Sequence, residues 1–224
     1  MDLAYIHGKR YTTLLLRVKD KYKMKIVYIH GAGATGESFN YIRDHLNHKD
    51  ELVLNYCSKQ GFDTNLLAMK EQLVDASDMF FIGHSLGGIY ALNLAAHYAE
   101  KVRGGVTLST PYGGSHAADF AKFLLPFSRL LRDIGPTSKP MKMTNKIAVR
   151  HPWCNVVSVR GDNPLMVEQN DGVVTLASMK HRSDMEFIEV PLNHYEIVIS
   201  PTTVNILKLK LKEITKNDSS VDKG

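Results

Sequence analysis

The alternation of apolar and polar residues predicts short buried strands separated by amphipathic helices. Nearly continuous apolar runs, typical of strands covered on both faces, lie at residues 25–29, 51–56, 80–82, 104–109, 155–159 and 187–190. Between them, apolar residues recur at helical spacing over residues 37–46, 65–76, 89–98 and 202–215. Because such alternation is typical of parallel βαβ units, we predict an α/β fold with a mostly parallel central sheet and helices on both faces.

In the helix over 37–46 the spacing predicts that Phe39, Ile42 and Leu46 face inward. The helix over 65–76 carries the apolar residues Leu66, Leu67, Met69, Leu73 and Val74. The last helix, over 202–215, has clear start signals, since Ser200 provides an N-cap and Pro201 suits the first helical position.

The two ends of the chain are less regular than its centre. Residues 3–7 and 11–18 are rich in β-forming residues and predict an opening hairpin. An alternative is that the essential domain begins at Met24 and that the preceding residues are an added edge. Because 224 residues suit one domain, we predict a single α/β domain over residues 1–216. The charged tail, residues 217–224, is predicted to be disordered.

Charge raises the question of nucleic-acid binding, because the formal net charge is +5 and the pI is near 9.1. The lysines gather at residues 19–25 and 208–216, and neither group is interleaved with aromatic residues in a recognisable nucleic-acid-binding module. We therefore expect solvated edges and no nucleic-acid partner. Weak attraction to anionic surfaces stays open.

The two cysteines, Cys57 and Cys154, provide neither a disulfide framework nor the spacing of metal ligands. A reducing compartment is compatible with this pattern, and a single disulfide stays an alternative. No stretch approaches the roughly 20 apolar residues of a membrane span, and the N-terminus lacks a long apolar signal region. We therefore expect a soluble, cytoplasmic protein without a transmembrane segment.

The stretch MFFIGHSLGGIY at residues 79–90 predicts a strand, a sharp turn and a helix, with Ser85 at the apex. Gly83 and Gly87 stand two residues before and after this serine, where larger side chains would collide with the strained turn. The spacing G-x-S-x-G is that of a nucleophile elbow, which presents a serine hydroxyl at the end of a strand. An ordinary Gly/Ser turn is the alternative, but the strand before and the helix after favour the elbow.

On this motif the chain resembles the α/β-hydrolase superfamily, and the form GHSLGG is similar to its lipase and esterase branch. The segment HGAGATG, residues 30–36, resembles the HG-x-G turn of lipases, where the residue after HG donates its amide to the oxyanion. The resemblance implies Ala32 as one donor and Leu86, directly after the serine, as the other. A rival interpretation is a dinucleotide fingerprint, since G-x-G-x-x-G begins at Gly31, but no acidic residue ends the strand over 51–56.

A serine nucleophile needs a base, commonly an imidazole, and a carboxylate that orients the base. In α/β-hydrolases the order along the chain is nucleophile, acid, base. Asp171 begins a DGVV segment that resembles the acid-bearing segment of lipases, and His194 follows the last predicted strand. We therefore predict a triad of Ser85, Asp171 and His194. The competing positions are Asp162 and Asp184 for the acid and His181 for the base.

Residues 116–150 interrupt the regular alternation of strands and helices. Their apolar stripe, with Pro126 as a kink, predicts a helical lid or cap over the serine, and the alternative is a pair of helices packed on the sheet. Just before it, STPYGGS resembles the T-P-H-x-G-S turn of lipases with a tyrosine replacing the histidine, and a Pro-Gly loop is an equal alternative. The residues predicted to line the substrate pocket and lid are Tyr112, Phe120, Leu124 and Phe127.

These motifs predict a serine hydrolase that cleaves carboxylic esters of lipid-like or apolar acyl groups through an acyl-enzyme. The expected partner is a small-molecule or lipid ester, and transient contact with a lipid surface stays open. No cofactor is expected, and no metal, because no cluster of acidic, histidine and cysteine residues has ligand spacing. The alternatives are a thioesterase, amidase or acyltransferase with the same triad, or a catalytically inactive binding protein of the same fold.

Overall fold

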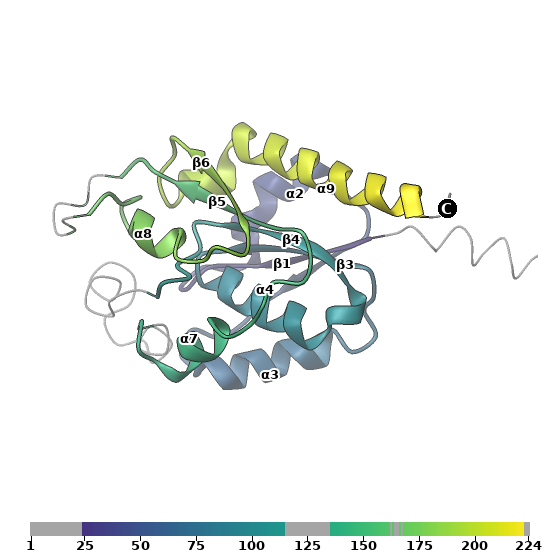
Figure 1. Ribbon diagram of the computed structural model, residues 1–224, viewed down its shortest axis with the longest axis horizontal. Helices are drawn as coiled ribbons and strands as arrows, with labels where there is room; N and C mark the ends of the chain where they lie inside the picture. Colours follow the sequence, from purple (N-terminus) through teal and green to yellow (C-terminus); the bar gives the residue numbers. More distant parts are fainter. Residues whose placement is uncertain (1–23, 115–134, 162, 164–165, 167, 222–224) are drawn as a thin grey trace, which may run out of the picture.

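The computed structural model describes residues 24–114, 135–161, 163, 166 and 168–221. At its centre lies a six-stranded sheet in the order β2-β1-β3-β4-β5-β6, in which every pair of neighbouring strands is parallel. The strands are β1 (Lys25–Ile29), β2 (Glu51–Leu54), β3 (Met79–His84), β4 (Val102–Leu108), β5 (Trp153–Ser158) and β6 (Glu186–Val190). The predicted α/β fold with a mostly parallel sheet is confirmed (Figure 1).

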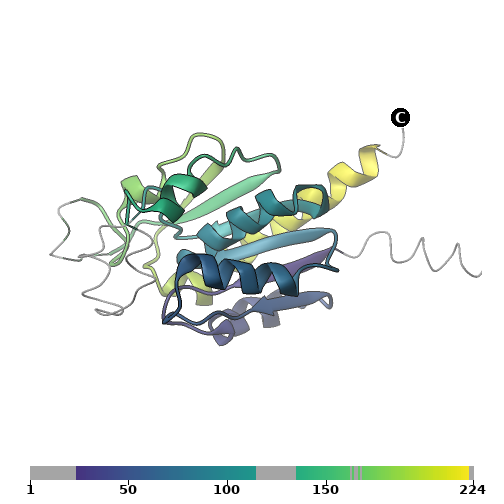
Figure 2. The same cartoon turned by 90° about the horizontal axis from the view of Figure 1, so that it is seen from below.

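Helices cover both faces of this sheet, as predicted. On one face lie α3 (Phe62–Gln72), α4 (Leu86–His97), α7 (Lys139–Thr144) and α8 (Leu176–Met179), whose buried residues belong to one hydrophobic cluster. On the other lie η1 (Gly36–Phe39), α2 (Asn40–Leu46), η3 (Glu196–Ile199) and α9 (Pro201–Val221), with a second cluster. A short turn of helix, η2 (Ala99–Lys101), leads into β4. Figure 2 shows the same layers from below.

The strands are continuously apolar because both of their faces are covered. In β1, Val27 and Ile29 belong to the cluster on the α4 side, whereas Ile26 and Tyr28 belong to the cluster on the α9 side. All four are fully buried. Successive side chains of a strand point to opposite faces, so a strand between two helical layers needs apolar residues at every position.

The helix predicted over 65–76 is present with other bounds, and only some of the apolar residues predicted for it are buried. The helix, α3, begins earlier, at Phe62, and ends at Gln72; Met69 and the C-cap residue Leu73 are fully buried. Leu67 and Val74, however, are 60% and 57% exposed. Leu67 follows the partly buried Leu66, and a step of one residue turns the side chain by about 100° around the helix axis. Val74 lies in the turn after the helix. Only one side of α3 faces the sheet.

The C-terminal end of the chain differs from the prediction, and the N-terminal end lies outside the described residues. α9 does not end at Thr215 but continues to Val221, so residues 217–221 of the predicted disordered tail are helical. After Pro201 no glycine or proline interrupts the chain before Gly224, which explains why the helix continues. The predicted hairpin in residues 3–18 lies outside the described residues.

Part of the predicted lid can be located. Residues 116–134 lie outside the described residues, whereas within 135–150 the short helix α7 packs on the core through Met141 and Thr144. In α7, Met141 is fully buried, and Thr144 Oγ1 accepts a 2.8 Å hydrogen bond from Asn93 Nδ2 of α4. The Arg182 guanidinium donates to the carbonyl of Thr144 at 3.1 Å. A mobile lid therefore stays a prediction for residues 116–134.

None of the helices in the described ranges combines the length and the apolar character that crossing a bilayer requires.

The exposure of α3 predicts a contrast between two leucines. Replacing the fully buried Leu73 with alanine should lower the free energy of unfolding by about 3 kcal/mol, because it removes apolar contacts and leaves a cavity. Leu67→Ala, at a position that is 60% exposed, should change it by less than about 0.5 kcal/mol. Urea denaturation of both variants measures the difference, and equal losses would contradict the orientation of α3.

Candidate active site

Ser85 lies at the carboxyl end of β3, in the sharp turn that leads into α4. Its backbone has φ 51° and ψ −121°, a conformation that a non-glycine residue adopts only when its surroundings enforce it. The neighbouring glycines are required by contact. A Cβ at Gly87 would lie 2.0 Å from the carbonyl oxygen of Ile29, and one at Gly83 would lie 2.7 Å from the Gly88 backbone. The predicted strand, sharp turn and helix are therefore present.

The side chain of Ser85 is buried, with 2% of the residue exposed. Within the described residues its Oγ has no hydrogen-bond partner. Its backbone, in contrast, is fixed, because the amide donates to the Leu108 carbonyl at 2.8 Å and the carbonyl accepts from Thr110 Oγ1 at 3.1 Å. This buried hydroxyl lies on a rigid turn and forms no hydrogen bond with its neighbours among the described residues. It is therefore available to a reacting group.

Asp171 and His194, predicted from distant parts of the chain, lie together. His194 Nδ1 is 2.7 Å from Asp171 Oδ2, and the His194 amide donates to the Asp171 carbonyl at 3.0 Å. The other carboxylate oxygen, Oδ1, accepts from the amides of Val173 at 3.0 Å and Val174 at 2.7 Å. Both side chains of the pair are nearly completely buried. This arrangement fixes the imidazole so that Nδ1 faces the carboxylate and Nε2 is left for another partner.

Two further serines that the sequence analysis missed continue this network. Ser158, the last residue of β5, donates from Oγ to Asp171 Oδ2 at 2.5 Å, and Ser109 Oγ lies 2.5 Å from Ser158 Oγ. Burial by itself raises the pKa of Asp171, but the interaction with His194 and the hydrogen bonds from Ser158 and the Val174 amide together lower it below the usual value. The carboxylate thus stays ionised. The signal that could have identified Ser158 is its position, a polar residue at the end of an otherwise apolar strand.

The histidine before the serine packs against the candidate base. His84 Nε2 is 3.0 Å from the His194 carbonyl oxygen, and the two ring centroids are 4.8 Å apart. Because a carbonyl only accepts, Nε2 carries the proton and donates. Burial first, and then the proximity of His194, lower the pKa of His84 to about 3, so the ring is neutral. Within the described residues its Nδ1 has no partner.

The glycine turn after β1 reaches the serine. A Cβ on Gly31 would lie 3.3 Å from Ser85 Cβ and 3.0 Å from His84 Nδ1. The next residue, Ala32, is 8% exposed, and Leu86 is the first residue of α4. Within the described part of the chain neither amide, of Ala32 or of Leu86, makes a hydrogen bond. Both N–H groups thus remain available beside the serine, and that of Leu86 gains from the positive end of the helix dipole.

The geometry of this turn argues against the dinucleotide interpretation. In dinucleotide-binding folds a long helix begins at the glycine-rich turn and holds the pyrophosphate. Here the turn leads into the short 3₁₀ segment η1, and the Gly36 amide is already bonded to Asn55 Oδ1 at 2.9 Å. The Gly36 amide is therefore not available to bind a phosphate.

The competing acids and base are placed differently from the predicted ones. Asp184 is engaged by Arg182, whose Nε and Nη2 donate to its two carboxylate oxygens at 2.9 and 2.7 Å. His181 is exposed and forms no hydrogen bond with Ser85 or Asp171 within the described residues. Asp162 lies outside those residues. Of the candidates that the structure describes, Asp171 and His194 are the pair that it brings together.

Tyr112, predicted to line a substrate pocket, is instead a core residue. It is fully buried, its hydroxyl accepts a 3.0 Å hydrogen bond from Trp153 Nε1, and Thr107 Oγ1 lies 3.1 Å away. Burial raises its pKa to about 12. The replacement of histidine by tyrosine in this turn thus serves packing, which the sequence could not reveal because Trp153 is distant in the chain. Phe120, Leu124 and Phe127 lie outside the described residues.

Over the described ranges, no group of three or more histidine, cysteine and acidic side chains is placed to hold a metal ion.

Comparison with known families gives one family-level match over the centre of the chain. The model of a family described as serine aminopeptidase, S33, matches residues 61–182, which is more than half of the 224 residues. This range includes Ser85 and Asp171, whereas His194 follows it. No curated protein sequence is significantly similar to this chain.

Solved structures share the fold at low sequence identity. The mature lipase BlEst2 of Bacillus licheniformis has a TM-score of 0.68 and 17% identity, over 84% of this chain and 92% of that one. An α/β superfamily hydrolase from Oenococcus oeni PSU-1 has a TM-score of 0.63 and 15% identity, over 85% and 92%. A monoacylglycerol lipase from Paleococcus ferrophilus has a TM-score of 0.58 and 13% identity, over 86% and 94%.

Because His84 is neutral in the folded protein, we predict that the free energy of unfolding falls as the pH is lowered. Unfolding lets this ring return to its ordinary pKa of 6.5, whereas in the fold it binds a proton only near pH 3. Between these values the unfolded state holds the extra proton, so stability falls as the pH falls. His84→Gln keeps a donor for the His194 carbonyl but cannot titrate, and should reduce the loss between pH 6.5 and 5 by roughly 2 kcal/mol.

Urea denaturation across this pH range measures the effect. His97→Gln, at an exposed histidine on α4, is the matched control and should keep the wild-type slope. If His84→Gln and wild type lose stability equally with acid, the buried neutral histidine is contradicted.

Proposed function

Because the chain belongs to the serine aminopeptidase S33 family and has the fold of the α/β-hydrolases, we propose that it is a serine hydrolase that cleaves carboxylic esters. The observation that carries this proposal is the buried 2.7 Å contact between His194 and Asp171, at the same edge of the sheet as the strained elbow that holds Ser85. An elbow serine, a base and an orienting acid are the groups that acyl transfer through a covalent intermediate requires.

In the proposed reaction Ser85 Oγ attacks the acyl carbonyl while His194 Nε2 takes up the hydroxyl proton. Asp171 holds Nδ1–H, which keeps the accepting nitrogen on the side away from the carboxylate, and its charge stabilises the imidazolium that forms. The imidazolium then gives its proton to the leaving alcohol oxygen as the C–O bond breaks. The product of this half of the reaction is an acyl-enzyme on Ser85.

The negative charge that develops on the carbonyl oxygen is proposed to face the amides of Ala32 and Leu86. Both donors are without other bonds among the described residues, and both lie on rigid segments next to the serine. Such preorganised donors lower the barrier without a reorganisation of solvent. Water, deprotonated by His194, then attacks the acyl-enzyme in the reverse sequence and releases the acid.

We assign the acyl group to the lipid-like or apolar class. The support is the apolar stripe of residues 116–134 in the sequence and the description of two of the similar structures as lipases, BlEst2 and the monoacylglycerol lipase. A second candidate is cleavage of amides, including aminoacyl amides, because the family is described as a serine aminopeptidase. The same nucleophile, base and donors serve both bonds, and pocket shape decides between them.

A fluorophosphonate probe tests the nucleophile. Wild type should be labelled at one residue, and Ser85→Ala should lose the label and at least about 1000-fold in kcat/KM, since the residual rate comes from binding and the oxyanion donors alone. Ser183→Ala, at an exposed serine, is the matched control and should label like wild type. Labelling that persists in folded Ser85→Ala would refute the assignment.

The same proteins then rank the substrates. We expect p-nitrophenyl esters to be cleaved faster than aminoacyl p-nitroanilides, with kcat/KM rising from acetate to octanoate because longer chains bury more apolar surface. Preference for the anilides would favour the aminopeptidase candidate over the esterase.

Gly31→Val tests the oxyanion turn. The added side chain would begin 3.3 Å from Ser85 Cβ and would displace the turn that carries the Ala32 amide. Loss of one such donor corresponds to about 3 kcal/mol in the barrier, so kcat should fall by roughly 100-fold while the free energy of unfolding changes less. Thr35→Val, at an exposed position of the same turn, is the control. Unchanged turnover in a folded Gly31→Val protein would remove this role.

A further inference from the structure

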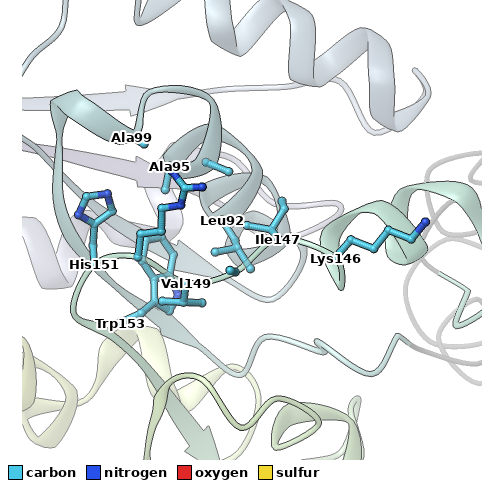
Figure 3. A pocket seen from close by; sticks show the side chains of 11 residues that line it. Leu92, Ala95, Ala99, Lys146, Ile147, Val149, His151 and Trp153 are labelled. Atoms are coloured by element: carbon cyan, nitrogen blue, oxygen red, sulfur yellow. The ribbon is translucent and has the colours of Figure 1, made fainter.

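A cavity lies away from Ser85, between the carboxyl-terminal half of α4 and the segment that leads into β5 (Figure 3). Its volume is about 320 Å³, at the lower end of the range typical of small-molecule sites. The helix contributes Leu92, Ala95 and Ala96, η2 contributes Ala99, and the facing segment contributes residues 146–151 and Trp153. None of Ser85, Asp171 and His194 is part of its lining.

The cavity lies at the opposite edge of the sheet from the elbow. Trp153 begins β5 and is in register, through Gly105 of β4, with Phe81 of β3. Phe81 precedes Ser85 by four residues, which corresponds to about 13 Å along the strand. A ligand here would thus occupy a site of its own.

The body of the cavity is aliphatic and exists because small side chains lie on α4 and at the start of η2. Ala95 and Ala96 of α4 and Ala99 of η2 leave open the space that longer side chains would fill. Opposite them are Ile147 and Val149, and Figure 3 shows Leu92 and Ile147 near its centre. Such a surface favours an unbranched alkyl chain.

The polar groups of the lining lack partners and are suited to an anion. Lys146 and Arg150 are exposed, and within the described part of the chain neither forms an ion pair. The Nε2 atom of His151 is buried, and over the same residues it has no hydrogen-bond partner. In Figure 3, His151 and Lys146 lie at opposite ends of the cavity. A buried ring nitrogen without a partner is costly unless a ligand supplies one.

We propose that this cavity binds a medium-chain carboxylate, with its alkyl chain along the alanine face of α4 and its carboxylate at Arg150 and His151. The planar guanidinium suits the two oxygens of a carboxylate, and a ring N–H of His151 would donate to one of them. Lys146 adds positive charge at the other end of the opening. The inference does not rest on the proposed ester chemistry at Ser85.

The fluorescence of Trp153 can report on this site, because Trp153 lines the cavity and is the one tryptophan of the sequence. Octanoate added to the full-length protein should change the fluorescence of Trp153 in a saturable way. A 2-bromo-octanoate probe should quench it, since its bromine stands next to the carboxylate, at the end of the cavity where His151 and Trp153 lie (Figure 3). Octanol and octyltrimethylammonium, with the same chain but no carboxylate, should bind at least about tenfold more weakly.

Two pairs of variants locate the ligand. Arg150→Gln should raise the Kd for octanoate about tenfold by removing the carboxylate partner, whereas Lys142→Gln, at an exposed lysine of α7 outside the cavity, should leave it unchanged. Ala96→Leu should weaken binding by at least about tenfold by filling the cavity. Its control is Ala68→Leu, at an exposed alanine of α3. Circular dichroism establishes that each variant is folded.

Several results would overturn the proposal. Octanol that binds as tightly as octanoate, or equal weakening by Arg150→Gln and Lys142→Gln, would refute specific carboxylate recognition. Binding that survives Ala96→Leu would place octanoate elsewhere. A change in Trp153 fluorescence with protein concentration alone, together with a dimer in sedimentation, would assign the cavity to a second copy of this chain.

Discussion

The close approach of α4 to the end of β1 is the constraint on which the candidate site depends. The helix begins so near to β1 that a single added carbon at Gly87 would lie 2.0 Å from the Ile29 carbonyl oxygen. It is equally close to the turn after β4, since a carbon added at Gly88 would lie 1.9 Å from Thr110 Oγ1. This contact forces the turn before the helix to be sharp, and it places Ser85 at φ 51°. It also brings the chain that leaves β1 against the serine. The elbow and the glycine turn are therefore consequences of one packing arrangement.

The charged part of the site is stable because every oxygen of the buried carboxylate is engaged. An isolated carboxylate in the interior would be costly and would tend to take up a proton. Asp171 avoids this through two backbone amides, the Ser158 hydroxyl and the imidazole of His194. The neighbouring His84 adds no competing charge, since burial keeps it neutral. The single ionised group of this buried network thus faces the histidine that it orients.

The two edges of the sheet have different chemical character, and they are linked by a hydrogen bond between two core residues, Trp153 and Tyr112. The carboxyl edge gathers hydroxyls, imidazoles and free amides around Ser85, whereas the amino edge near Trp153 is lined by alanines and other aliphatic residues. Trp153 lines the aliphatic cavity with its ring and donates its N–H to Tyr112, in the turn that follows β4. Tyr112 is thereby fixed in the core instead of facing a substrate.

The fold could be derived from the sequence because its signals are local. Continuous apolar runs mark strands that are covered on both sides, and a glycine pair around a serine marks a sterically strained turn; neither depends on distant residues. The order of Ser85, Asp171 and His194 along the chain likewise followed from motifs. The features that the sequence could not predict depend on contacts between segments that are far apart in the chain.

Leu67 of α3 and Leu73, the C-cap residue of the same helix, have the same chemistry, and only the position of the sheet beside α3 makes the first exposed and the second buried. Ser158 becomes a partner of Asp171 because β5 ends beside the loop that carries the acid. Tyr112 becomes a core residue because Trp153 begins a neighbouring strand. The sequence by itself therefore determined the elements and the residue types of the site, since these follow from periodicity and local sterics. The tertiary structure alone decided exposure and hydrogen-bond partners, which depend on the proximity of residues distant in the chain.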